Sequence, residues 1–428
     1  MPDNTIDWGQ GSANNDIGWG KGPINNDLSW GMIGEDSYGH DETNLMGGGA
    51  SFINTFGQPA LGLSLRDLTG TDPNVVRVRR DSDDAEADFK ASEVSDGTLL
   101  NWVNEAQTLF DENFASSTGW TLRSGITISG GNLNLLNVTN SAEAAYKSFG
   151  SIPFQKVLIT ITVTDYVQGA IYVTNLGGGG DTSPNIIANG TYTYEITLGD
   201  GNTNWGIGTS SGPTTLKVSN LKVEKISANG LVRTWYGQGN TLNAAQATAI
   251  AQPANVTSGA IETLNNLPAI SYIDDNFSVF SNTSSLTGEF LITFVGSMSP
   301  DGTVNVFLNA LVSANRFRVN LDGGLGVIEI RINGVTVSSF GDFPLDTQMI
   351  FQLERDSNNL ISFYINGVLQ GNATQEGDWV DILTYLGSNQ DQTPTQFLQM
   401  KSQALVIYNS AADREGIANY LNGIYTIY

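Results

Sequence analysis

The sequence predicts an all-β protein, and three observations carry that prediction. Thr, Val, Ile, Gly and Asn dominate most of the chain, which is the composition of strands joined by tight turns. Asn-Gly stands between apolar runs in "RINGVTV" (331–337) and "FYINGVLQ" (363–370), a strong hairpin signal because both turn positions need a positive φ. A long helical pattern occurs only at the C-terminus. We expect two β-sandwich (jelly-roll) domains, one inserted in the other, with an extended N-terminal arm and a short C-terminal helix.

The length of 428 residues exceeds what one hydrophobic core usually reaches, so more than one domain is expected. Changes in composition divide the chain into three parts. They are an arm at 1–50, a discontinuous sandwich at 51–104 plus 227–428, and an inserted sandwich at 105–226.

The arm repeats one short phrase. Cut into blocks of eleven from residue 4, the sequence places Trp8, Trp19 and Trp30 in one column, and each is followed by a glycine, namely Gly9, Gly20 and Gly31. Burying one indole removes about 150–250 Å² from water, so a row of them suits an arm that anchors the chain to a partner surface. A tail folded back on its own globular part and a disordered low-complexity segment are the alternatives.

The segment after the arm contains a strand and an acidic run. Val76 and Val78 alternate with Arg77 and Arg79, the period of a half-buried strand. Five acids follow, which are Asp81, Asp83, Asp84, Glu86 and Asp88. Such carboxylates can bind calcium or act in acid/base catalysis, but five acids beside three arginines are more typical of a solvated loop that neutralises its own charge.

Residues 105–226 show strand patterns about every 10 residues with turn signals between them, which indicates a β-sandwich. Aromatic side chains exposed on one face of such a domain could stack on sugar rings. The candidates are Trp120, Tyr166, Tyr172, Tyr194 and Trp205. For each of them, packing in the core is the competing and commoner role.

The last predicted element is the C-terminal helix. Ile417, Tyr420, Leu421 and Ile424 recur at helical spacing and should pack against a sandwich. Ser410 is the expected N-cap, with an acid three residues later.

Charge and composition exclude several functions. Asp and Glu outnumber Lys and Arg by 43 to 19, for a formal charge of −24, and such a surface repels nucleic acid and anionic lipid. There is no cysteine, no apolar stretch long enough to span a membrane and no export leader, so we expect no membrane insertion. The single histidine, His40, is expected to be solvated, which leaves little imidazole chemistry. No cofactor is expected and metal ligands stay unassigned: related sandwiches often hold structural calcium, but no Asp-x-Asp-x-Asp-Gly loop occurs.

Several stretches resemble known families. "FQLERDSNNLISFYINGVLQ", "LTYLGSN" and "ALVIYNSAADREGIANYLNGIY" are similar to the closing half of concanavalin A-like (laminin-G-like) jelly rolls. "LSLRDLTGTDPNVVRVRRDSDDAEADF" and "LVRTWYGQGNTLNAAQATAIAQPANV" resemble the front of an arabinofuranosidase B-like sandwich, interrupted here by 105–226. That insert resembles jelly-roll carbohydrate-binding modules. The Trp-Gly repeat followed by "DSYGHDETNLMGGG" resembles N-terminal segments of virion proteins of phages of Bacteroidetes-type hosts.

These resemblances imply a structural virion protein, such as a spike, head fibre or tail fibre. Its arm would bind other virion proteins, its sandwiches would bind host-surface carbohydrate, and it would be a homotrimer on the extracellular particle, made in the host cytoplasm. The alternative is a glycoside hydrolase acting on surface polysaccharide. A third reading is a capsid decoration without a ligand. No catalytic nucleophile and acid can be mapped, and Gly237 stands where the resembled "TWYDQSGN" has Asp, so we expect a non-enzyme.

Overall fold

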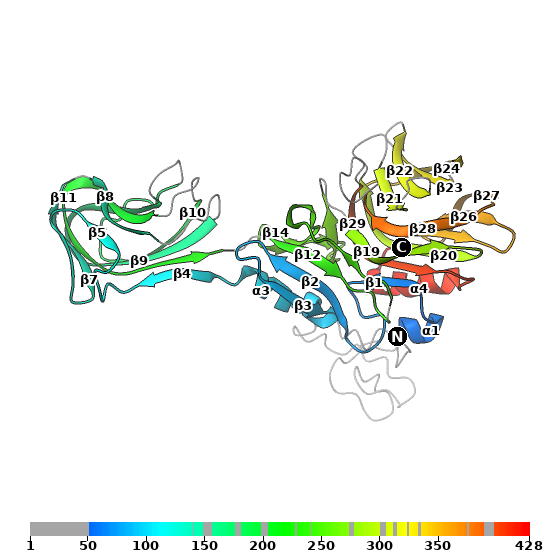
Figure 1. Cartoon of the computed structure of the whole chain (residues 1–428), viewed down its shortest axis with the longest axis horizontal. Helices are drawn as coiled ribbons and strands as arrows, with labels where there is room; N and C mark the ends of the chain where they lie inside the picture. Colours follow the sequence, from blue (N-terminus) through cyan, green and yellow to red (C-terminus); the bar gives the residue numbers. More distant parts are fainter. Residues whose placement is uncertain are drawn as a thin grey trace, which may run out of the picture. The chain divides into compact units, whose positions relative to one another are not determined.

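The computed structural model describes residues 51–428, except 140, 149–155, 176–180, 198–203, 227–228, 240, 274–277, 300–304, 311–314, 323–324, 333–334, 375 and 389–397. Ser51–Tyr428 form one compact unit, which is built almost entirely of antiparallel strands (Figure 1). The predicted all-β class is therefore confirmed. The predicted anchoring residues of the arm and His40 lie outside the described residues.

The larger sheet network joins strands from both sides of the 105–226 segment. It contains 19 strands among the described residues. They are β1 (Leu61–Ser64), β2 (Asn74–Arg80), β3 (Glu86–Lys90), β12 (Gly230–Trp235), β13 (Ala244–Ala245), β14 (Ala254–Thr257), β15 (Ala260–Ile261), β18 (Ile270–Tyr272), β19 (Ser278–Leu286), β20 (Phe290–Ser299), β21 (Asn305–Asn309), β22 (Arg316–Asp322), β23 (Leu325–Ile332), β24 (Val335–Phe343), β25 (Met349–Arg355), β26 (Leu360–Ile365), β27 (Val368–Thr374), β28 (Trp379–Leu386) and β29 (Gln399–Tyr408). A separate two-stranded hairpin pairs β16 (Thr263–Leu264) with β17 (Leu267–Pro268).

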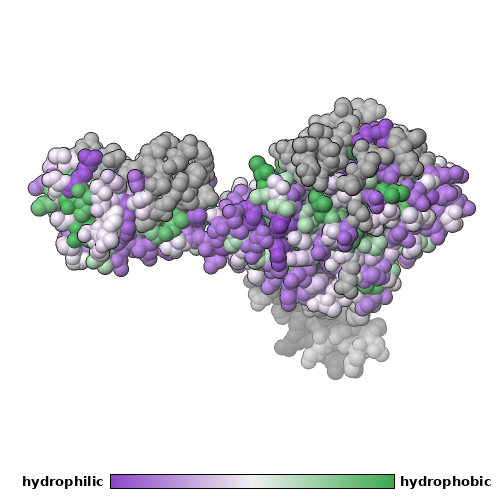
Figure 2. Space-filling view, in the orientation of Figure 1, coloured by the Kyte–Doolittle hydropathy of each residue, from purple (hydrophilic) through white to green (hydrophobic). Residues whose placement is uncertain are grey.

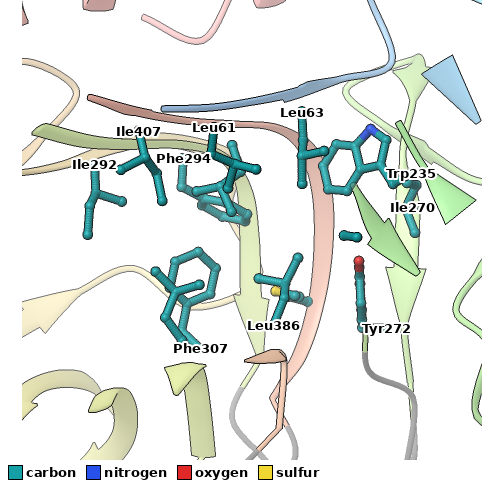
Figure 3. Close-up of a cluster of buried hydrophobic side chains, with 14 of the residues drawn as sticks. Leu61, Leu63, Trp235, Ile270, Tyr272, Ile292, Phe294, Phe307, Leu386 and Ile407 are labelled. Carbon is teal, nitrogen blue, oxygen red and sulfur yellow. The ribbon is translucent and has the colours of Figure 1, made fainter. Parts of the chain in front are cut away.

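The core of this network is a layer of apolar side chains between strands. Phe294 of β20 and Phe307 of β21 meet edge to face with ring centroids 5.0 Å apart. Figure 3 shows Leu61, Ile292 and Ile407 on the side of Phe294, with Leu386 on the side of Phe307. Successive side chains of a strand point to opposite faces, so Phe290, Ile292 and Phe294 of β20 share the face that lines this core.

The "FYINGVLQ" hairpin is confirmed in detail. Ile365 pairs with Val368 across the turn, and Asn366 and Gly367 have φ of 50° and 76°. Two positive φ values are the signature of the tight turn that Asn-Gly favours. In the other predicted hairpin, Ile332 pairs with Val335, which confirms that β23 and β24 are joined there.

The smaller sheet is formed within the 105–226 segment. Its eight strands are β4 (Gln107–Glu112), β5 (Trp120–Leu122), β6 (Ile126–Ser129), β7 (Asn132–Val138), β8 (Ser141–Ser148), β9 (Lys156–Asn175), β10 (Gly190–Thr197) and β11 (Asn204–Lys225). These strands have their own apolar cluster, which includes Ile159, Ile161 and Val218. The domain boundaries placed at 105 and 226 stay predictions.

Two long strands, β9 and β11, pair along most of their length and change register several times. Gly169 lies at one of these irregularities with φ of +88°, and a Cβ there would lie 2.6 Å from the Cα of Thr214 on the paired strand. Only glycine satisfies both the positive φ and the close approach of the two backbones.

The C-terminal helix is confirmed, with one correction. It is α4 (Arg414–Tyr425), and its N-cap is Asp413, whose carboxylate accepts a hydrogen bond from the Gly416 N–H. The predicted cap, Ser410, lies outside the helix and bonds the carbonyl of Ala411 instead. Asp caps a helix as well as Ser does, so capping preference alone does not distinguish the two residues.

The buried face of α4 follows the predicted stripe. Ile417 and Leu421 are fully buried against Leu291, Val295 and Val406, which lie on the outer face of β20 and β29. Tyr420 and Ile424 are partly buried at the same contact. The remaining helical elements are α1 (Phe52–Phe56), α2 (Ala91–Ser95), α3 (Thr98–Asn104) and the 3₁₀ turn η1 (Ala249–Ala251).

None of the helices in the described residues has the length and apolar character required to cross a bilayer.

Candidate functional site

Two of the five predicted glycan-binding aromatics belong to the core of the smaller sheet. Trp205 is 1% exposed and meets Phe110 edge to face at 6.2 Å. Trp120 is 8% exposed, packs on Phe114 and donates its indole N–H to the Glu112 carboxylate. Neither ring leaves a face open to a ligand. These two residues therefore pack in the core, which was the alternative to sugar binding.

The three predicted tyrosines are half-buried, at different places on the same sheet. The Tyr166 hydroxyl donates to the Gly169 carbonyl. The ring of Tyr172 covers Gly208, where a Cβ would lie 2.8 Å from a ring carbon. Tyr194, on the edge strand β10, rests on the apolar cluster and burial raises its pKa. The structure therefore does not bring the three together as one aromatic platform.

Tyr192 is an aromatic residue that was not among the candidates predicted from the sequence. It lies two residues from Tyr194, so both rings project from the same face of β10, and they are parallel within 6° with centroids 6.3 Å apart. The alternation "YTYEI" could have revealed this pair. Both rings pack partly on the cluster below them, and both are half-buried.

A pocket is present on the larger sheet, at a place that no motif indicated. Its floor is the outer face of the neighbouring strands β18, β29 and β20, where Ser271 pairs with Lys401 and Lys401 pairs with Ser297. Residues two positions along these strands share that face, so Gln399 and Ser299 extend the floor. Tyr272 and Met400 belong to the core cluster and also line the pocket.

The walls of this pocket come from two loops. Thr263, Leu264 and Asn265 of the β16–β17 hairpin form one wall, and Asp346, just before β25, contributes to the other. We call this site the hydroxyl pocket; its volume is about 360 Å³, and it is lined by Thr263, Leu264, Asn265, Ser271, Tyr272, Ile273, Ser297, Ser299, Asp346, Gln399, Met400 and Lys401.

A buried glutamine holds the hairpin wall in place. The side-chain amide of Gln403 donates to the backbone carbonyls of Leu264 and Leu267, and it accepts from the Gln348 amide at 2.5 Å. The backbone carbonyl of Gln403 in turn accepts from the Tyr425 hydroxyl of α4. The wall is therefore fixed by hydrogen bonds to a fully buried side chain, which keeps the pocket preformed.

An ion pair sets the charge at the base of the wall. The Lys401 ammonium donates to Glu262 at 2.8 Å and to the Thr263 carbonyl at 3.2 Å. Burial alone would raise the pKa of Glu262, but hydrogen bonds from Lys401 and Thr257 and the charge of Lys401 lower it. Glu262 is therefore ionised at neutral pH, and the ammonium group of Lys401 neutralises its charge.

The pocket presents hydroxyl and amide groups rather than a reactive constellation. Asp346 is the single carboxylate among the described residues that line it. The Ser271 hydroxyl is buried and has no hydrogen-bond partner among those residues. A buried polar atom left unpaired costs free energy, so a ligand hydroxyl or an ordered water at that point would be stabilising.

The predicted acidic run is neutralised by arginines. Arg77 binds Asp88 through two hydrogen bonds, and Arg80 pairs with Asp83 at 2.8 Å. Arg79 pairs with Asp84. The prediction of a self-neutralising region is confirmed, although Asp88 lies in strand β3 and not in the loop. Within the described part of 51–428, no group of three or more His, Asp or Glu side chains could hold a metal ion.

The face of the molecule displayed in Figure 2 is mostly polar. Figure 2 shows small separate apolar spots among hydrophilic residues on the displayed face. Exposed apolar side chains such as Val167, Ile187 and Val368 are consistent with such spots. On this face the described residues do not form one broad apolar patch of the kind that marks an obligate protein interface.

Comparison with known proteins gives only weak structural likeness. No family model matches the sequence, and no relative is found among curated proteins. Among solved structures, the binding domain of Paraclostridial Mosquitocidal Protein 1 has a TM-score of 0.32 and 11% identity, over 44% of this chain and 48% of that one. A structure of botulinum neurotoxin type C, described as dependent on two ganglioside molecules for cell entry, has a TM-score of 0.28 and 13% identity, over 43% and 50%.

A mutant of NanB sialidase from Streptococcus pneumoniae has a TM-score of 0.25 and 15% identity, over 32% of this chain and 26% of that one. The matched regions thus span half or less of each of these three structures. Likeness at this level carries no argument about what the present chain binds or catalyses.

Proposed function

We propose that this protein binds glycans through its β-sandwiches and that it serves as an attachment protein of a virus particle, anchored by residues 1–50. The single observation that supports glycan binding is the hydroxyl pocket, a preformed concave site with convergent polar groups. The virion role is supported by the Trp-Gly repeat of the arm and by the resemblances described above.

The lining of the pocket matches the chemistry of a sugar. A sugar ring presents several hydroxyls that both donate and accept, and Ser271, Ser297 and Ser299 can do either, while Asp346 only accepts when ionised. Leu264 and Ile273 add apolar surface for the C–H groups of the ring. The volume of about 360 Å³ lies near the lower end of the range for ligand pockets, about 300–1,000 Å³. One or two sugar units would fit such a space.

Binding without hydrolysis is the form of this function that the pocket favours. Glycoside hydrolysis generally requires two carboxylic groups on either side of the scissile bond, one of them protonated. The described lining has one carboxylate, and nearby Glu262 is held ionised by Lys401. At Gly237, where the resembled sandwiches have Asp, a Cβ would lie 2.7 Å from the Thr241 carbonyl oxygen, so an acid cannot be accommodated there without rearrangement.

Glycan binding is tested with the full-length chain on an array of neutral and acidic glycans. We expect saturable binding that is lost in Ser299→Tyr, which places a bulky ring on the floor of the pocket, and weakened in Asp346→Asn. Ser117→Tyr, an equal change at an exposed site in the connection between β4 and β5, is the control and should bind as the wild type does. Binding that survives both pocket substitutions would contradict the assignment of the site.

The absence of turnover is tested separately. Wild-type protein is incubated with aryl arabinosides and with host polysaccharide, and released sugar is measured. If sugar is released and a single carboxylate substitution abolishes that release, the protein is a glycoside hydrolase and this proposal is wrong.

The anchoring role is tested by deleting residues 1–46. We expect a folded 47–428 fragment that no longer enters particles, and sedimentation of the full-length chain as a trimer. Continued incorporation of the fragment would refute the arm as an anchor.

A further inference from the structure

The charges of the hydroxyl pocket do not balance. Its described lining contains one cationic side chain, Lys401, and one carboxylate, Asp346. The Lys401 ammonium is already paired with Glu262 at 2.8 Å, and it donates a second hydrogen bond to the Thr263 carbonyl at 3.2 Å. The positive charge of Lys401 is therefore neutralised beside the wall of the pocket. Asp346 is left as the net charge of the described lining.

Asp346 combines an anchored backbone with a free carboxylate. Its N–H donates to the Met298 carbonyl at 3.1 Å, and Met298 lies between the floor residues Ser297 and Ser299 of β20. The side chain is exposed, and its carboxylate makes no ion pair or hydrogen bond with any residue that the structure describes. The pocket therefore presents one negative charge, held next to its floor, that has no counterion among those residues.

A second observation is the unpartnered hydroxyl on the floor. Ser271 is 1% exposed and lines the pocket, and its Oγ makes no hydrogen bond within the described part of the chain. A hydroxyl accepts a hydrogen bond as well as donating one, so it suits a ligand group that can only donate. A protonated amine is such a group, because it carries three N–H donors and no acceptor. Ser297 and Ser299 add two more hydroxyls of this kind.

We propose that the hydroxyl pocket binds a sugar that carries a free, protonated amino group, with Ser271 as a hydrogen-bonding group on its floor and Asp346 as the residue that determines the preference for the amine. The proposal rests on the glycan-binding function above and adds the class of its ligand. An acidic sugar is disfavoured, because the one cation of the described lining is already paired. The formal charge of −24 acts in the same direction, since it attracts cations to the protein and repels anions.

The test uses simple glycosides that differ in charge. Methyl glucosaminide, methyl glucoside and methyl glucuronide carry an ammonium, a hydroxyl and a carboxylate on the same ring, and their galactose counterparts repeat the series in a second configuration. Binding of each to the full-length protein is measured by NMR titration at low salt.

The expected preference is moderate, because Asp346 is exposed and ion pairs between exposed groups stabilise weakly. In at least one configuration the amino sugar should bind about three- to fivefold more tightly than its neutral twin, and the uronide should bind more weakly than both. Added salt should reduce the difference. Amino sugars that bind no more tightly than their neutral twins in both configurations overturn the inference.

Charge variants locate the preference. Asp346→Asn removes the charge, keeps the size of the side chain and suits the φ of 55°, a left-handed conformation that Asn adopts readily. It should weaken binding of the neutral probe slightly and abolish the preference for the amine. Glu195→Gln is the matched control and should keep the preference, because Glu195 is an exposed carboxylate without an ion pair in the described residues but lies on β10 of the smaller sheet. Should Asp346→Asn fail to fold by circular dichroism, Asp346→Gly, which adopts a positive φ freely, takes its place.

The floor is tested with Ser271→Ala. Removing a buried hydroxyl that has no partner should leave the thermal unfolding temperature unchanged or raise it, while binding of the amino sugar weakens. Unchanged binding of the amino sugar in Ser271→Ala would overturn the role of this hydroxyl.

The failures of the two proposals are distinguishable. A preference for the amine that persists in Asp346→Asn, or that is lost equally in Glu195→Gln, overturns Asp346 as its determinant. A protein whose binding of neutral glycans is lost in Ser299→Tyr, but which does not prefer the amines, overturns this inference alone. A protein that binds no glycan of any charge overturns the proposed function and this inference with it.

Discussion

The pairing of β9 and β11 makes a quantitative prediction at Gly169. In the substitution Gly169→Ala, the new Cβ would lie 2.6 Å from the Thr214 Cα and 2.8 Å from its Cβ, distances that real Cβ atoms do not reach. The residue also keeps φ of +88°, which costs a non-glycine residue about 1–2 kcal/mol. Because the obstructing Cα is backbone on a paired strand, relief requires the strands to separate locally.

The expected loss of stability is the sum of these effects. Overpacking typically adds about 1–3 kcal/mol, and the alanine gains back about 0.4–1 kcal/mol by restricting the unfolded chain. We expect Gly169→Ala to destabilise the smaller sheet by about 2–4 kcal/mol. Gly130→Ala is the matched control in the same sheet, since Gly130 has φ of +60° but nothing within 4 Å of its Cβ position. It should cost about 1 kcal/mol or less.

The assay is hydrogen exchange followed by mass spectrometry on peptides from β9 and β11, which reports the stability of this sheet separately from the larger one. Faster exchange in Gly169→Ala than in Gly130→Ala is the predicted result. Equal exchange in the two variants would refute the close approach of the two strands at Thr214.

The remaining predictions concern the helix cap, the pocket ion pair and the core tryptophan. Asp413→Ala should lower the free energy of unfolding by about 1 kcal/mol in urea denaturation, while Ser410→Ala has no effect, because Asp413 caps α4. A larger loss of stability in Ser410→Ala than in Asp413→Ala would instead identify Ser410 as the N-cap. The pKa of Glu262 is lowered in the folded state, so its stabilisation is full above the ordinary value of 4.5 and is lost as pH falls through the folded pKa. The stability difference between wild type and Glu262→Gln in a pH series should therefore shrink below pH 4.5, and a constant difference would contradict the ion pair. Trp205→Ala should cost about 3–5 kcal/mol and Tyr194→Ala clearly less in thermal unfolding, and similar costs would mean that Trp205 is not a core residue.

Local patterns in the sequence were sufficient for the elements whose cause is local. The Asn366–Gly367 turn follows from the conformational freedom of two adjacent residues, and the strand with Val76 and Val78 follows from alternation alone. The N-cap of α4 was placed three residues early because Ser410 and Asp413 have equal capping chemistry. What separates them is the point at which the chain leaves β29, which tertiary structure determines.

The candidate sites could not be predicted from local sequence patterns. An aromatic residue such as Trp205 suits both a core and a sugar-binding face, and burial decides between them only after folding. The hydroxyl pocket combines residues from 263–265, 271–273, 297–299, 346 and 399–401, each of which looks ordinary in its own strand. Long-range pairing, and not composition, creates this site.

Whether the hydroxyl pocket binds a sugar is decided by calorimetry of the full-length protein with the best glycan from the array, in wild type and Ser299→Tyr. We expect saturable binding with one site per chain in the wild type and none in the variant, with Ser117→Tyr unchanged. Undiminished binding in Ser299→Tyr, at the same stoichiometry, would contradict it.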